Sequence, residues 1–85
     1  MNDDLMEVIK DEKLLLMEGY DDCIIGIGSR ANSGDRFVVY DTRKIISKLI
    51  NEQGFIYEEA VEFYEFNQAC AWHGCKTPAF VEIFE

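Results

Sequence analysis

Residues 23–54, CIIGIGSRANSGDRFVVYDTRKIISKLINEQG, decide the fold. The runs CIIGIG (residues 23–28) and RFVVYD (residues 36–41) are short and rich in β-branched residues, so both are expected to be strands. The segment SRANSGDR is dominated by residues that favour turns and predicts a loop. Two strands joined by a loop of this length most simply form an antiparallel hairpin.

A helix is expected immediately after the second strand. Asp41 and Thr42 can cap its start, and Gly54 is suited to its end. Between them, the isoleucines and the leucine share one face, and the basic residues lie towards the other. The segment is therefore predicted to be an amphipathic helix that covers the hairpin.

The flanking segments complete an α+β domain. Apolar residues recur at helical spacing over residues 3–18, although Glu12 interrupts the stripe and favours a break near Asp11. A third helix is expected over residues 57–73, and residues 79–84, AFVEIF, resemble a third strand after Pro78. The prediction is one domain, residues 1–85, in which about three helices pack on a small three-stranded antiparallel sheet.

The charge of the chain points to the type of partner. Seventeen acidic residues against eight basic ones give a net charge of −9, which disfavours direct binding to nucleic acid or to an anionic membrane. A partner protein with a basic surface is electrostatically plausible, as is a basic groove that normally holds nucleic acid. The same acidity also serves ordinary solubility.

The compartment is expected to be the cytoplasm. The start, MNDDLMEVIKDEK, lacks the basic and apolar regions of a signal peptide, and no apolar run reaches the length of a membrane span. The three cysteines have no disulfide-like spacing. A domain of 85 residues buries a modest core, so homodimerisation would also be favourable.

The third predicted helix carries the candidate partner-binding residues. Glu58, Glu62 and Glu65 form a stripe opposite the apolar side, flanked by Glu59 and near Tyr57. Four carboxylates beside exposed aromatic residues such as Tyr57 or Phe66 can present an acidic surface to a basic partner. A solvated helix face remains the alternative interpretation.

Asn67 falls in the middle of the apolar side of that helix. A buried amide needs hydrogen-bond partners. The Asn67 side chain is therefore expected to hydrogen-bond to the backbone of the turn at Thr77 and Pro78 and to hold that turn in place. An alternative is that Asn67 lines a polar pocket or an interface.

The stretch NQACAWHGCKTPAF gathers Cys70, His73 and Cys75. Structural zinc usually takes four ligands, and a fourth would have to come from Cys23, which is expected to face the core. A cysteine–histidine nucleophile would need an orienting group and an oxyanion hole that nothing in the sequence identifies. No metal ion, cofactor or catalytic residue is therefore predicted.

Arg30, Arg36 and Arg43 are the candidate anion-binding residues. Together with a helix N-terminus at Thr42, they could hold a phosphate or a nucleotide. The alternative is that they are surface arginines that offset an acidic chain. The sequence GIGSRA imitates a dinucleotide-binding fingerprint, but a polar loop follows it where the fingerprint requires a helix.

Three stretches, EGYDDCIIGIG, VVYDTRKIISKLI and EEAVEFYEFNQACAWHGCKTPAF, together resemble a family of small bacteriophage and prophage proteins. The resemblance spans about residues 18–81 and departs from the family pattern at Cys70, His73 and Cys75. It implies a phage or mobile-element origin and no particular reaction. The positions that match the family pattern are Asp22, Tyr40, Asp41, Glu59, Glu62, Asn67, Gly74, Thr77 and Pro78.

The sequence therefore favours a non-enzymatic, phage-type binding protein in the host cytoplasm. Its expected partner is a host or defence protein with a basic surface, which it would inhibit by occupying a groove for nucleic acid. A protein that sequesters a nucleotide or phosphate, an accessory structural protein and a small metal-dependent enzyme are the alternatives.

Overall fold

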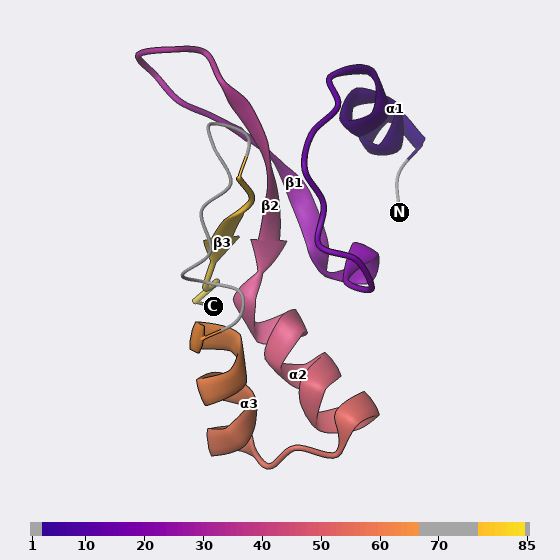
Figure 1. Ribbon diagram of the computed structural model, residues 1–85. Helices are drawn as coiled ribbons and strands as arrows, with labels where there is room; N and C mark the ends of the chain where they lie inside the picture. The colour runs from indigo at the N-terminus through magenta and orange to yellow at the C-terminus, as the bar shows by residue number, and fades with distance from the viewer. Residues whose placement is uncertain (1–2, 67–76, 85) are drawn as a thin grey trace.

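The computed structural model describes residues 3–66 and 77–84, which form an α+β fold (Figure 1). This confirms the predicted fold class, with three α-helices and a three-stranded sheet in the described residues. The elements in chain order are α1 (Asp3–Asp11), the short 3-10 helix η1 (Asp21–Cys23), β1 (Ile24–Ser29), β2 (Arg36–Asp41), α2 (Thr42–Gln53), α3 (Tyr57–Tyr64) and β3 (Ala79–Val81).

The sheet has the order β1-β2-β3, so β2 lies at its centre. The predicted antiparallel hairpin is confirmed, with Ile27 opposite Val38 and an irregularity in register between Ile24 and Gly26. β3 runs parallel to β2, and this pairing differs from the antiparallel one expected. The reason is the connection: residues 42–78 contain α2 and α3, and a crossover of this length can return a strand in the same direction.

α2 has the boundaries that its sequence predicts. The Asp41 carboxylate accepts hydrogen bonds from the backbone amides of Arg43 and Lys44, at 2.9 and 3.4 Å. Gly54 ends the helix in the left-handed conformation, with φ of 75°, which costs a glycine little. Ile45 and Leu49 are buried on the face of α2 that packs on the core.

Two buried tyrosines connect the strands to the N-terminal segment and to the helices α2 and α3. The Tyr40 hydroxyl accepts a hydrogen bond of 2.7 Å from the backbone amide of Met17, and its ring lies 5.9 Å from that of Phe80. The Tyr64 ring meets Phe80 edge-on at 5.5 Å, and its hydroxyl lies 3.1 Å from that of Thr42. Both rings are buried with their polar tips hydrogen-bonded, as buried tyrosines require.

The N-terminal helix is shorter than expected. α1 ends at Asp11, and Lys13 takes the left-handed conformation with φ of 54°, so the prediction of a helix to residue 18 is wrong beyond the expected break. Ile9 and Leu14 are buried, whereas Leu15 and Leu16 are exposed. The chain then runs alongside β1 before η1 (Figure 1).

The cap of α2 can be tested by substitution. Asp41→Ala should lower the free energy of unfolding by about 1 kcal/mol, because two amides of the first turn lose their acceptor. Asp41→Asn, which keeps a side-chain oxygen, should lose much less. Urea denaturation followed by circular dichroism measures both, and equal losses in the two variants would contradict this role of Asp41.

Candidate functional site

α3 begins with a hydrogen bond made by one of its own glutamates. The Glu59 carboxylate accepts a hydrogen bond of 3.0 Å from the backbone amide of Ile56, which is one of the amides that a helix start leaves without a partner. Ala60 and Tyr64 are buried on the inner face of the helix. Glu59 therefore holds the start of α3, and the burial of Ala60 and Tyr64 fixes which side of the helix faces outwards.

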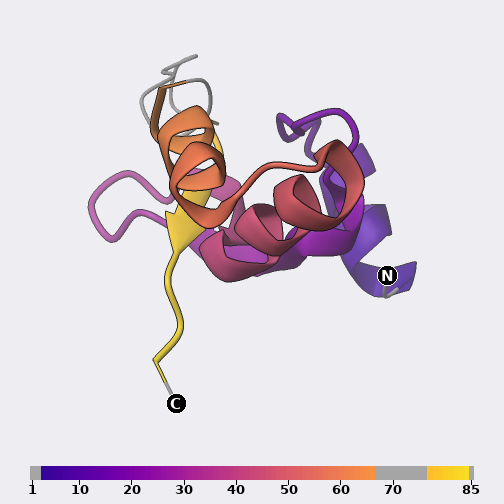
Figure 2. The ribbon, with the colours of Figure 1, turned by 90° about the horizontal axis from the view of Figure 1, so that it is seen from below.

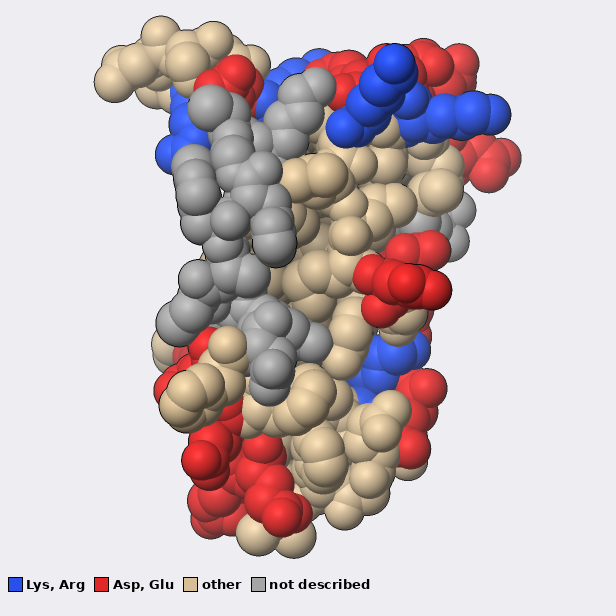
Figure 3. Space-filling view, viewed as in Figure 1, with Lys and Arg blue, Asp and Glu red and all other residues tan. Residues whose placement is uncertain are grey.

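The four predicted glutamates Glu58, Glu59, Glu62 and Glu65 are all exposed. Figure 3 shows acidic side chains gathered over α3, at the lower left of the molecule. Ion pairs within the described residues involve Glu12, Asp22 and Glu52, and none involves these four. The outer side of α3 is therefore a surface of one charge sign.

A shallow hollow of about 340 Å³ lies within this surface. It is lined by three aromatic and two acidic side chains, and we call it the α3 hollow: Phe55, Glu59, Glu62, Phe63 and Phe66. The Phe55 and Phe63 rings lie 5.4 Å apart at an angle of 52°, and 79% of Phe66 is exposed. Aromatic faces and carboxylates both attract cations, so the hollow suits a lysine or arginine side chain.

Of the two aromatic residues predicted beside these glutamates, Phe66 lines the α3 hollow and Tyr57 does not. Tyr57 is 63% exposed but lines a separate hollow that faces α2. Phe63 is also exposed, beside Phe55 and Phe66. Helical spacing already places Phe66 next to Glu62, four residues earlier, whereas the contribution of Phe55 depends on the loop between α2 and α3.

The three predicted anion-binding arginines lie in different surroundings. Arg36 forms an ion pair of 3.2 Å with Glu12, and the Arg30 guanidinium lies over the Phe37 ring at 5.5 Å. Arg43 lies at the other end of β2, beyond a six-residue strand that measures about 20 Å. The structure therefore does not bring the three side chains together.

The start of α2 is also occupied. The amides of Arg43 and Lys44, which an anion would need, already donate to Asp41. The Arg43 guanidinium lies 5.2 Å from the Phe84 ring centre. Nothing in this arrangement favours a phosphate at the helix N-terminus over the carboxylate that is already there.

The remaining predicted site residues fall largely outside the described residues. These include Asn67, Cys70, His73 and Cys75. The structure therefore describes neither the hydrogen bonds predicted for Asn67 nor the positions of the candidate zinc ligands. Thr77 is described and is buried, as a locking role would require. Within residues 3–66 and 77–84, no group of three or more His, Cys, Asp or Glu side chains is placed to hold a metal ion.

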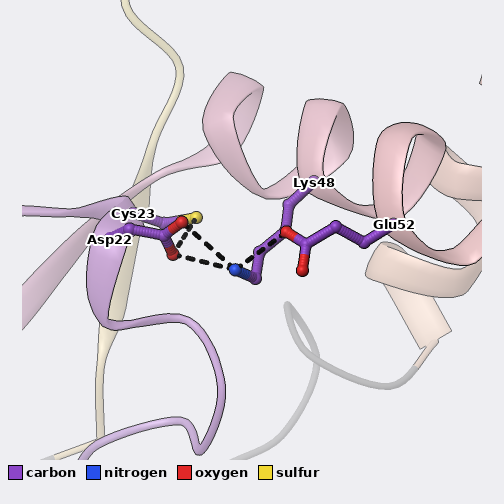
Figure 4. Close-up of polar contacts among 4 residues, drawn as sticks. All are labelled: Asp22, Cys23, Lys48 and Glu52. Atoms are coloured by element: carbon purple, nitrogen blue, oxygen red, sulfur yellow. Dashed lines mark hydrogen bonds and ion pairs between the residues drawn. The ribbon is translucent and has the colours of Figure 1, made fainter.

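An ion-pair cluster that was not predicted from the sequence joins η1 to α2 (Figure 4). The Lys48 ammonium lies 3.1 Å from Asp22 and 3.0 Å from Glu52. The hydrogen bond from Lys48 lowers the pKa of Asp22, and the bonds to Glu52 and Asp22 raise the pKa of Lys48. The spacing of Lys48 and Glu52 could have been recognised as an i,i+4 pair, but Asp22 joins them only through the fold.

Cys23 lies beside this cluster and is buried. Its burial, reinforced by the Asp22 charge, raises the pKa of the thiol to about 11. A thiol with such a pKa stays protonated at neutral pH and is a poor nucleophile. The ion pair between Lys48 and Asp22 therefore joins α2 to η1, and the Cys23 thiol beside it is protonated at neutral pH.

Comparison of this chain with protein-family models, with curated proteins and with solved structures finds no match. Among the described residues, no helix is both long and apolar enough to cross a membrane. The fold and the surfaces of the chain itself are therefore the basis for any proposal about its function.

The low reactivity of Cys23 can be tested by alkylation. At pH 8 its thiolate fraction should be about 100-fold lower than for a thiol with the ordinary pKa of 9.0, because the pKa is about 11. Iodoacetamide labelling followed by peptide mass spectrometry should show slow modification of Cys23 in the native protein and rapid modification in urea. Equal rates under the two conditions would contradict the burial of this thiol.

Proposed function

We propose that this chain is a non-enzymatic binding protein that engages a basic partner protein through the outer surface of α3. The observation that carries the proposal is the α3 hollow, in which Glu62 and the exposed Phe66 lie side by side among aromatic rings. Acidic side chains alone are common on soluble proteins. Exposed aromatic rings, by contrast, are enriched in surfaces that bind other proteins.

The electrostatics of α3 support this proposal. Glu58, Glu62 and Glu65 are spaced at intervals of three and four residues, so their charges lie close together on one face. Carboxylates this close together repel one another. A lysine or arginine from a partner would reduce this repulsion and could place its charge over an aromatic ring. The net charge of −9 would accelerate the encounter with a basic protein and would repel nucleic acid.

The partner in this proposal is a host or defence protein, met in the cytoplasm of an infected cell. A groove that normally holds DNA or RNA is lined with lysine and arginine, and an acidic helix could occupy it and inhibit its owner. The resemblance of residues 18–81 to phage and prophage proteins motivates this choice of partner. Sequestration of a nucleotide or phosphate is less well supported, because Arg30 and Arg36 lie at the opposite end of β2 from Arg43.

The proposal can be tested with a fluorescent nine-arginine peptide as a model of a basic surface. Fluorescence anisotropy should show binding to the wild-type protein at low salt. The double variant Glu62→Lys and Glu65→Lys should bind at least about tenfold more weakly, because each change reverses a charge at the site. Phe66→Ala should also weaken binding, by about tenfold, although it leaves the net charge unchanged.

A variant with the same change of charge provides the control. Glu7 and Asp11 are exposed on α1, away from the α3 hollow, so Glu7→Lys and Asp11→Lys together add the same positive charge elsewhere. This control should bind the peptide almost as well as the wild type. An equal loss in both double variants, with no effect of Phe66→Ala, would show that net charge rather than the α3 surface governs binding.

A further inference from the structure

A second hollow, of about 380 Å³, lies between α2, the start of α3 and the segment that follows β3. We call it the C-terminal groove. Ile46, Ile50 and Tyr57 supply its apolar lining, and Arg43 and Glu82 supply charges of opposite sign. It shares no residue with the α3 hollow, so the two surfaces can be changed independently.

The segment that forms one side of the groove is an arm, residues 82–84. Figure 2 shows that the chain after β3 runs away from the helices and the sheet. Ile83 is exposed, and Phe84 is exposed over 77% of its surface, with its ring 5.2 Å from the Arg43 guanidinium. The chain therefore places an exposed aromatic side chain next to an apolar hollow on the same face of the molecule.

The charges of the groove favour a second copy of the chain as the occupant. A symmetric dimer uses the same patch twice, so a patch must be complementary to itself. In such a contact, Arg43 of each copy faces Glu82 of the other, and the Phe84 ring of each copy meets the apolar lining of the other. A partner that is uniformly basic or uniformly acidic would be attracted by one of these charges and repelled by the other.

We propose that the C-terminal groove and the arm form the interface of a symmetric homodimer, in which the arm of each copy covers the groove of the other. Small domains gain from burying apolar surface between subunits, and here the groove and the aromatic side chain are both exposed. The α3 hollow stays open in this dimer, so the proposal is independent of binding to a basic partner. Because each copy carries a net charge of −9, association should strengthen as salt screens the repulsion.

Sedimentation equilibrium of the wild-type protein and two charge variants tests the proposal. The wild type should dimerise, more tightly at 300 mM than at 50 mM NaCl. Arg43→Glu and Glu82→Arg, each alone, should weaken the dimer at least about tenfold, because each places like charges across the interface. An equimolar mixture of the two variants should form a heterodimer, because both cross-subunit pairs then have opposite charges again.

Further variants separate the interface from general effects. Phe84→Ala should weaken the dimer by about tenfold, as truncation of a central aromatic side chain does at interfaces. Lys10→Glu and Glu7→Arg make the same charge changes at exposed positions of α1 and should leave the dimer unchanged. Circular dichroism of every variant establishes that its fold is intact.

Three results would overturn the proposal. One is a wild-type protein that stays monomeric up to the highest concentrations measured. Another is a dimer that Phe84→Ala leaves unaffected. The third is a mixture of Arg43→Glu and Glu82→Arg that stays as dissociated as its components, which would rule out the reciprocal pairing on which the interface depends.

Discussion

The buried hydroxyl of Tyr40 is the interaction on which the rest of the arrangement depends. Tyr40 lies in the central strand with 0% of its surface exposed, and its hydroxyl accepts a hydrogen bond from the backbone amide of Met17. Its ring packs against Phe80 of β3, so one side chain joins the N-terminal segment, β2 and β3. A buried hydroxyl without a partner would cost about 1–3 kcal/mol, so the position of Met17 is strongly constrained.

The position of β2 then determines where both candidate surfaces lie. Asp41, the residue after Tyr40, caps α2, so the helix begins where the strand ends and its direction is set by the core. α3 packs through Ala60 and Tyr64, and the hydrogen bond between Tyr64 and Thr42 holds it beside the start of α2. With these residues facing inwards, helical geometry turns the glutamates outwards and exposes the α3 hollow.

Local signals explain why some features were predictable. The capping carboxylate of Asp41 and the left-handed Gly54 bound α2 as the sequence indicated, because both act within a few residues of the helix ends. The direction of β3 depends on the path of residues 42–78 in space, and no pattern within residues 79–81 encodes it. The glutamates of α3 were identified from helical spacing, whereas their aromatic neighbour Phe55 depends on how the loop before α3 folds back.

The charged residues of α3 are all acidic, unlike those of α2. Residues 57–66, YEEAVEFYEF, contain four glutamates and no lysine or arginine, although like charges at helical spacing cost about 0.2–0.5 kcal/mol per pair. α2 carries three basic residues and one acidic residue, and it pairs Lys48 with Glu52. A basic partner of the kind proposed would supply the cations that α3 lacks, beside the exposed Phe66.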